Sequence, residues 1–381
     1  MRRNLNWLFA LPLLLCLAVA YNNCGGPRAN LDDGSDGTGT GNPQLPGEPE
    51  IEYNSFIYVA AQGGVRAYSL DANKQLVPAT VTGGPSNSNV LLSVAADPKG
   101  QYVFTSGFSP NTLLNTYSVN QTTGALTFVS SLQYGGQFPY SLRVDPKGEV
   151  IYAGDNDRQS VWAFRLNRTT GATTLIGEYN IGGTGSSYAE LGIQPTGGSL
   201  YVMSGNTQIR QAAIGATGAL SLTQSYNVSA SHFTFAHDGR FLFAGNFGGN
   251  TIQTFAVASN GALTASPAIN GGQGNLSRLQ TDATGQYLFA SAQGGSSIAA
   301  YAIGVNGELT FKSAANVPGA NFFAITGDHT GTMVYASART GNDVIHQFQL
   351  DRATGTLTKV GATFNNGSNV YGMTFLKVPK P

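Results

Sequence analysis

Three residues with complementary chemistry occupy the same position in successive copies of a repeated unit. Glu190, His232 and Arg278 each stand seven residues before a turn glycine. A carboxylate or an imidazole can take a proton from water, and a guanidinium can stabilise an oxyanion on a carbonyl group. The set suits hydrolysis of an ester-like bond or binding of an anionic or hydroxylated small molecule. The same side chains could instead form an ion pair or a solvated wall.

The repeated unit is marked by two series of turn glycines, whose members are separated by 42 to 49 residues. The first series contains Gly100, Gly148, Gly197, Gly239, Gly285 and Gly331. The second contains Gly124, Gly171, Gly218, Gly261, Gly307 and Gly355. Short runs rich in Phe, Val, Ile and Thr lie between the turns, as in β-strands. A period of about 45 residues with four strands per unit predicts β-propeller blades.

The clearest copy is Ser231–Thr264, which we interpret as a four-stranded antiparallel meander. Counting strands along the chain gives seven blades, but the count begins on a second strand, Phe56–Ala60, and ends on a first strand, Tyr371–Lys377. Ring closure removes the open sheet edges of a linear array. We therefore expect Tyr371–Lys377 to complete the blade that Phe56–Ala60 begins. The prediction is an all-β, seven-bladed propeller over residues 54–377, with a short tail at residues 378–381.

Ring closure would place equivalent first-strand positions at equal depth around one axis. Those positions are Ser93, Ser141, Glu190, His232, Arg278, Ala324 and Gly372. The first strand of a blade is normally the innermost, so we expect these residues near one mouth of a central channel. Three of them, Glu190, His232 and Arg278, are the candidate catalytic residues. The small neighbours leave room for a ligand, and Ser93 and Ser141 are candidate ligand-binding residues.

The N-terminal segment carries the features of an export signal. Arg2 and Arg3 precede the apolar run Leu8–Ala20, which is short for a membrane span. Cleavage after Ala20 or before Cys24 is compatible with the sequence. Cys24 would be the only cysteine of the mature chain, which favours lipidation over a disulfide. We expect a signal peptide at residues 1–23 and a flexible tether at residues 24–53, rich in Gly, Pro and Asp.

Composition restricts the partners. The net charge is zero and only 10% of residues are charged, so the chain has no electrostatic footprint for nucleic acid. It contains no phosphate-binding loop, no H-E-x-x-H and no C-x-x-C pair. We therefore expect no cofactor and no metal, and a monomer whose membrane association depends on the lipid at Cys24.

The repeat resembles a known family. The pattern D-P-K-G-x-x-x-Y followed by G-A-L-T is similar to that of the seven-bladed lactonase-type propellers, which include 6-phosphogluconolactonase and the muconate-lactone cyclases. In that resemblance His232 falls on the family's histidine, Asn246-Phe247 on its Asn-Tyr pair, and Glu190 on its glutamate. It therefore adds Asn246 as a candidate ligand-binding residue. The glutamate blade precedes the histidine blade here, whereas it follows in the family.

Two functions remain open. The first is a lipid-anchored protein of the bacterial cell envelope that binds a small polar or anionic ligand, or another envelope protein. The alternative is a lactone hydrolase of the carboxylic-ester class, with Glu190 or His232 activating water and Arg278 stabilising the oxyanion. Neither function requires a metal or a nucleotide. An exported location argues against a phosphorylated cytosolic substrate.

Overall fold

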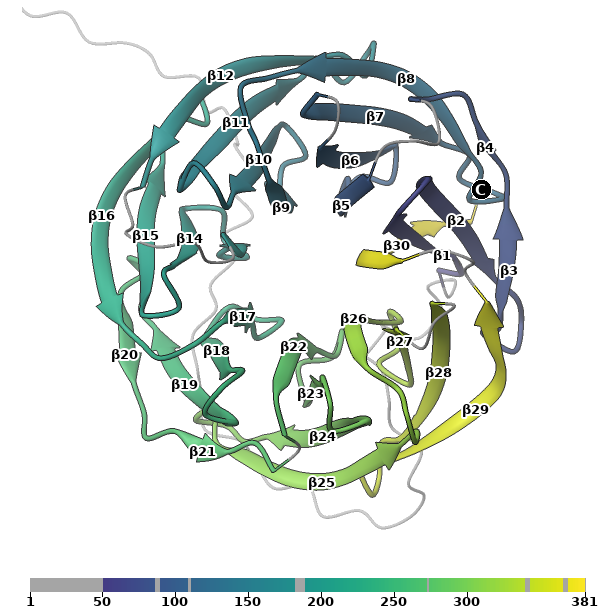
Figure 1. Ribbon diagram of the computed structural model, residues 1–381, viewed down its shortest axis with the longest axis vertical. Coiled ribbons are helices and arrows are strands. Elements are labelled where there is room, and N and C mark those ends of the chain that lie inside the picture. The colour runs from purple at the N-terminus through teal and green to yellow at the C-terminus, as the bar shows by residue number, and fades with distance from the viewer. Residues whose placement is uncertain are drawn as a thin grey trace, which may run out of the picture. The chain divides into compact units, whose positions relative to one another are not determined.

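The computed structural model describes residues 51–85, 90–108, 111–181, 189–272, 274–339, 343–365 and 369–380. The predicted signal peptide, almost all of the predicted tether, and Cys24 lie outside these ranges. The described strands form seven small sheets arranged in a ring (Figure 1). Within the described ranges no helix is long and apolar enough to cross a membrane.

We number the blades in chain order of their innermost strands. Blade 1 contains β5 (Val90–Ala96), β6 (Tyr102–Phe108), β7 (Leu113–Val119) and β8 (Leu126–Gln133). Blade 2 contains β9 (Pro139–Val144), β10 (Val150–Asp155), β11 (Ser160–Leu166) and β12 (Thr173–Asn180). Blade 3 contains β13 (Leu191–Ile193), β14 (Ser199–Ser204), β15 (Gln208–Ile214) and β16 (Leu220–Asn227). Blade 4 contains β17 (His232–Phe235), β18 (Phe241–Asn246), β19 (Thr251–Val257) and an outer strand in two pieces, β20 (Leu263–Ala265) and β21 (Ile269–Asn270).

The remaining blades follow the same plan. Blade 5 contains β22 (Leu276–Thr281), β23 (Tyr287–Ala292), β24 (Ser297–Ile303) and β25 (Leu309–Asn316). Blade 6 contains β26 (Phe322–Gly327), β27 (Met333–Ala338), β28 (Val344–Asp351) and β29 (Thr356–Asn365). Blade 7 contains β30 (Val370–Pro379), β1 (Tyr53–Ala61), β2 (Gly64–Leu70) and β3 (Leu76–Ala79). The short strand β4 (Val81–Thr82) pairs in parallel with β8 of blade 1.

Both ends of the described chain meet in blade 7. Strand β30 pairs antiparallel with β1, so that Phe56 lies opposite Leu376 and Tyr58 opposite Thr374. The C-terminal strand is thus the innermost strand of the blade that the N-terminal strands begin (Figure 1). The predicted closure and the predicted seven blades are both confirmed.

The repeated Asp-x-x-Gly turns explain why the period is visible in the sequence. In the D-P-K-G turn of blade 2, Asp145 Oδ1 accepts the backbone N–H groups of Glu149 at 2.6 Å and Val150 at 2.7 Å. Gly148 has φ of 69°, in the left-handed region that glycine adopts without steric cost. The glycine recurs in all six of these turns between a first and a second strand, and an aspartate three residues before it recurs in four of them, at Asp97, Asp145, Asp282 and Asp328.

Aromatic side chains fill the space between neighbouring blades. One position of the third strand carries Tyr68, Tyr117, Phe164, Phe255, Tyr301 and Phe348, all of them buried. In one cluster Phe348 of blade 6 packs with Phe322 of the same blade and Phe289 of blade 5. This agrees with the packing role that a repeated position predicts. The packed blades hold the innermost strands in place around the axis.

Candidate functional site

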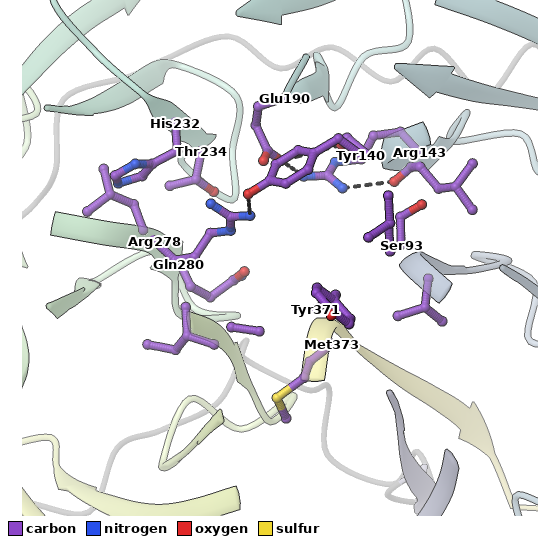
Figure 2. Close-up of a pocket in the computed structure, with 18 of the residues that line it drawn as sticks. Ser93, Tyr140, Arg143, Glu190, His232, Thr234, Arg278, Gln280, Tyr371 and Met373 are labelled. Carbon is purple, nitrogen blue, oxygen red and sulfur yellow. Dashed lines mark hydrogen bonds and ion pairs between the residues drawn. The ribbon is translucent and has the colours of Figure 1, made fainter. Parts of the chain in front are cut away.

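A cavity of about 110 Å³ lies among the innermost strands around the axis of the ring (Figure 2). It is lined by all seven of the equivalent first-strand residues, Ser93, Ser141, Glu190, His232, Arg278, Ala324 and Gly372. The ring therefore gathers the three candidate catalytic residues around a single cavity. We call this space the axial cavity.

Glu190 is held by the neighbouring blade. It immediately precedes β13 of blade 3, and its side chain is 9% exposed. Its Oε1 accepts a hydrogen bond from Arg143 Nη2 at 2.7 Å (Figure 2). The same oxygen accepts one from Ser141 Oγ at 3.4 Å, and both donors are on β9 of blade 2. Within the described residues Oε2 makes no hydrogen bond. The carboxylate is thus oriented through Oε1.

Arg278 makes a contact across the ring. It lies on β22 of blade 5, and its Nη2 donates a hydrogen bond to the hydroxyl of Tyr140 on β9 of blade 2 (Figure 2). The guanidinium also lies over two rings, 5.2 Å from the centroid of Tyr140 and 5.7 Å from that of Phe323. Blades 2 and 5 are not neighbours, so this contact crosses the axis of the ring. We call the pair of Arg278 and Tyr140 the crossbar.

His232 is enclosed although it lines the cavity. It is 2% exposed, and its buried Nε2 has no hydrogen-bond partner in the described structure. A side chain on Gly245 of the adjacent strand would come within 2.4 Å of that nitrogen, so the glycine makes room for the imidazole. Burial, with a further contribution from the Arg278 charge, lowers the pKa of His232 to about 3. The ring is therefore neutral at physiological pH.

The three candidate ligand-binding residues are placed differently. Ser93 and Ser141 line the axial cavity, where Ser93 Oγ donates to the carbonyl oxygen of Pro139 at 3.2 Å. Asn246 lines neither this cavity nor the second one described below. Its Oδ1 accepts from Gly249 N at 2.9 Å and its Nδ2 donates to Ser229 Oγ at 2.8 Å. Asn246 therefore shapes the turn after β18.

Sequence reasoning missed Arg143, Tyr140 and Phe323. Arg143 stands two residues after Ser141 on β9, and side chains two apart share a face of a strand. That spacing could have identified it. Tyr140 and Phe323 instead stand one residue before the equivalent position, which strand alternation would turn away from the axis.

A recurrent β-bulge brings these side chains to the cavity. In blade 2 Gly154 lies opposite Ser141 and Asp155 opposite Pro139, so Tyr140 is the extra residue of the bulge. The innermost strands of blades 1, 5, 6 and 7 contain the same bulge, and its extra residues are Leu92, Ser277, Phe323 and Tyr371. Each of these five residues lines the axial cavity or the second cavity. Bulges are frequent beside functional sites because they re-aim a side chain.

The fold and the site define a closed seven-bladed propeller with a polar cavity on its axis. The family described as "Lactonase, 7-bladed beta-propeller" matches residues 72–187 and 262–373. The chain belongs to this family. Ser93, Ser141 and Arg278 fall inside the matched segments, whereas Glu190 and His232 fall between them. Among the described residues no three His, Cys, Asp or Glu side chains are grouped to hold a metal ion.

Several solved structures share the fold. A proposed 6-phosphogluconolactonase of Bacteroides fragilis is 19% identical, with a TM-score of 0.72 over 85% of this chain and 98% of that one. The periplasmic gluconolactonase of Pseudomonas aeruginosa is 17% identical, with a TM-score of 0.70 over 86% and 100% of the two chains. A protein of Lactobacillus plantarum is 15% identical, with a TM-score of 0.74 over 85% and 100%. No curated protein matches the chain by sequence.

Proposed function

We propose that the protein hydrolyses a small lactone in the axial cavity. The observation that carries the proposal is that one cavity is lined both by the carboxylate of Glu190, which Arg143 orients, and by the guanidinium of Arg278, which bonds the hydroxyl of Tyr140. Membership of the lactonase family supports the reaction class. Fold alone would not support it, because one fold carries many functions.

The chemistry assigns one role to each group. Glu190 Oε2 accepts a proton from a water molecule while the oxygen of that water attacks the carbonyl carbon of the lactone. The Arg278 guanidinium stabilises the negative charge that develops on the carbonyl oxygen. The bond between the carbonyl carbon and the ring oxygen then breaks, and the proton held by Glu190 passes to that ring oxygen. The product is a hydroxy acid, with every atom of the water retained.

Arg143 is a positioning residue in this scheme. Its hydrogen bond fixes Glu190 through Oε1 and directs Oε2 away from that contact. His232 is not assigned as the base, because its Nε2 lies against Gly245 and is buried. Its neutral ring contributes to the wall of the cavity.

The test uses Glu190→Gln and a matched control. The amide keeps the shape of the side chain but cannot accept the proton. We expect kcat for δ-gluconolactone, measured above the spontaneous rate, to fall by about 10²–10⁴-fold. Glu178→Gln changes an exposed glutamate paired with Arg158 on blade 2 and should leave kcat unchanged. Equal rates for the wild type and Glu190→Gln would refute the proposed mechanism.

Ligand binding without turnover is the second candidate, and the enclosure of His232 favours it. Burial of its Nε2 and the pKa of about 3 make His232 a poor base, so the site has one base fewer than a hydrolase could use. In this case Arg278 would hold an anionic or hydroxylated ligand. Gluconate would then bind to the wild type and less tightly to Arg278→Gln, and no variant would turn over a lactone.

We further propose that the protein is exported and anchored to the cell envelope by a lipid on Cys24. The support is the sequence, which combines a basic start, a short apolar run and a lone cysteine of the mature chain. The similar structure from Pseudomonas aeruginosa is that of a periplasmic gluconolactonase, which is compatible with this location. An unphosphorylated lactone fits an exported enzyme better than a phosphorylated one.

A further inference from the structure

A second cavity of about 100 Å³ adjoins the axial cavity across the crossbar. Both cavities are lined by Tyr140, His232 and Arg278. The second cavity is also lined by loop residues between second and third strands, among them Phe247 and Gln293. We call it the outer cavity. A ligand bound at Arg278 can therefore extend into both the axial cavity and the outer cavity.

The two compartments differ in chemistry. The axial cavity contains the ion pair of Glu190 and Arg143, whereas the outer cavity is lined by the rings of Tyr140, Phe247 and Phe323. Tyr140 and Phe323 reach it because each is the extra residue of a β-bulge. Aromatic faces at a concave site favour an apolar or aromatic group.

The serines of the outer cavity are already engaged. Ser231 Oγ accepts the backbone N–H of Phe247 at 2.9 Å. Ser277 Oγ donates to the carbonyl oxygen of Phe322 at 2.8 Å and lies 2.9 Å from Ser291 Oγ. These hydroxyls hold the wall of the outer cavity in place and have little capacity left to bond a hydroxyl group of a ligand there. Recognition is left to the rings, the guanidinium and the side-chain amides.

Positive charge is concentrated beside the aromatic rings. Arg278 lies 5.7 Å and Arg339 3.9 Å from the ring centroid of Phe323. Arg339 also lies 5.0 Å from the centroid of Tyr371. Guanidinium groups stacked on rings keep their charge and stiffen the rings they cover. The outer cavity is thus lined both by the positively charged guanidinium of Arg278 and by aromatic rings.

We propose that the outer cavity binds the aromatic group of the ligand, while the ligand's carbonyl or carboxylate group lies at Arg278. The substrate would then be an aryl-substituted lactone, and the product an aryl-substituted hydroxy acid. The inference that the ligand is a lactone substrate rests on the proposed function. The inference that the protein binds an aryl-substituted carboxylate does not. The volume is of the same order as the ~150 Å³ apolar cavity that accepts a benzene ring in another protein.

The binding test compares phenylacetate with acetate by titration calorimetry. Both carry a carboxylate, but only phenylacetate carries a ring. The wild type should bind phenylacetate at least about tenfold more tightly than acetate, and Phe247→Ala should remove about tenfold of that affinity. Phe311→Ala, which changes a half-exposed ring on the outer strand β25, is the control and should bind as the wild type does. Equal binding of the two anions, or equal effects of the two substitutions, would overturn the inference.

The turnover test separates this inference from the proposed function. It compares δ-valerolactone with and without a phenyl group on the carbon beside the ring oxygen. We expect kcat/KM to favour the phenyl lactone by about tenfold in the wild type, and Phe247→Ala to abolish that preference. If neither lactone is hydrolysed but phenylacetate binds through Phe247, hydrolysis fails and the ligand class stands. If both are hydrolysed equally and phenylacetate does not bind, hydrolysis stands and the ligand class fails.

Discussion

The two arginines of the axial cavity have different partners, and this difference determines the chemistry of the site. Arg143 makes a salt bridge with Glu190 at 2.7 Å, while Arg278 bonds a neutral phenol on the far side of the axis. A phenol does not cancel the charge of a guanidinium. In the proposed function the Arg278 guanidinium meets an anionic ligand or an oxyanion, while Arg143 orients Glu190.

His232 should make the fold sensitive to acid. Its pKa is about 3 in the folded protein, lowered mainly by burial, against an ordinary value of 6.5. As the pH falls from 6.5 toward 3, the unfolded chain binds a proton that the folded protein rejects, so the free energy of unfolding falls. At pH 4.5 the loss from this residue is about 2–3 kcal/mol. His232→Gln should lose less stability than the wild type between pH 6.5 and 4.5 in thermal unfolding.

The matched control for this experiment is His237→Gln, which changes an exposed histidine in the turn after β17. It should follow the pH profile of the wild type. His346 also has a lowered pKa, about 4, and contributes equally to all three proteins. Parallel profiles for the wild type and His232→Gln would contradict the predicted role of His232.

At the scale of elements, neighbouring blades are joined by cations that reach buried aspartates. Arg168, in the turn after β11, bonds Asp97 of the preceding blade at 2.7 Å, and Arg352 bonds Asp282 in the same way at 2.9 Å. Both aspartate side chains are 0% exposed. The same aspartates accept backbone N–H groups of their own turns. Each pair therefore joins the turn of one blade to its neighbour.

Removing such a cation should destabilise the ring. Arg168→Met leaves the buried Asp97 carboxylate without its charged partner, at an expected cost of about 1–3 kcal/mol. Arg158→Met removes an exposed arginine whose salt bridge is with Glu178 of its own blade, and should cost about 0–1 kcal/mol. Chemical denaturation measures both. If both variants lost the same free energy of unfolding, the salt bridge between blades would contribute no more to stability than a salt bridge within one blade.

Strand β30 should be indispensable. Deleting residues 371–381 removes the innermost strand of blade 7, exposes an edge of β1, and strips Leu376 and Val378 from the core between blades. We expect aggregation, or a fall in the free energy of unfolding of more than about 5 kcal/mol. A loss of that size is exceptional for a single substitution. Deleting residues 25–49 is the comparison and should have a small effect on the melting temperature. Similar melting temperatures for the two deletions would contradict the importance of closure.

At the scale of the whole molecule, the chain joins a closed ring to an N-terminal segment with an export pattern. Lipidation at Cys24 remains a prediction from the sequence. The protein recovered from the membrane fraction should have an intact mass that begins at Cys24 and includes acyl chains. Cys24→Ser should release an unmodified protein, whereas Cys16→Ser, which lies in the predicted signal, should not. An unmodified mature chain beginning at Tyr21 would refute the lipid anchor.

The sequence by itself determined the number of blades, the closure through the last strand, and the register that places Glu190, His232 and Arg278 around one cavity. It could do so because the turns are local. A glycine with positive φ recurs at a fixed offset in six turns, and in four of them an aspartate accepts turn N–H groups, so the repeat can be recognised along the chain.

The partners of those residues were decided only by the tertiary structure. Glu190 meets Arg143 because adjacent blades bring β9 beside the end of the loop before β13. Arg278 meets Tyr140 because the closed ring sets blades 2 and 5 across a space that these two side chains can span. The bulges that aim Tyr140 and Phe323 toward the mouth break the alternation from which strand faces are inferred. Such contacts depend on the curvature of the ring and on the bulges in its strands. Neither can be deduced from the spacing of residues within one repeat.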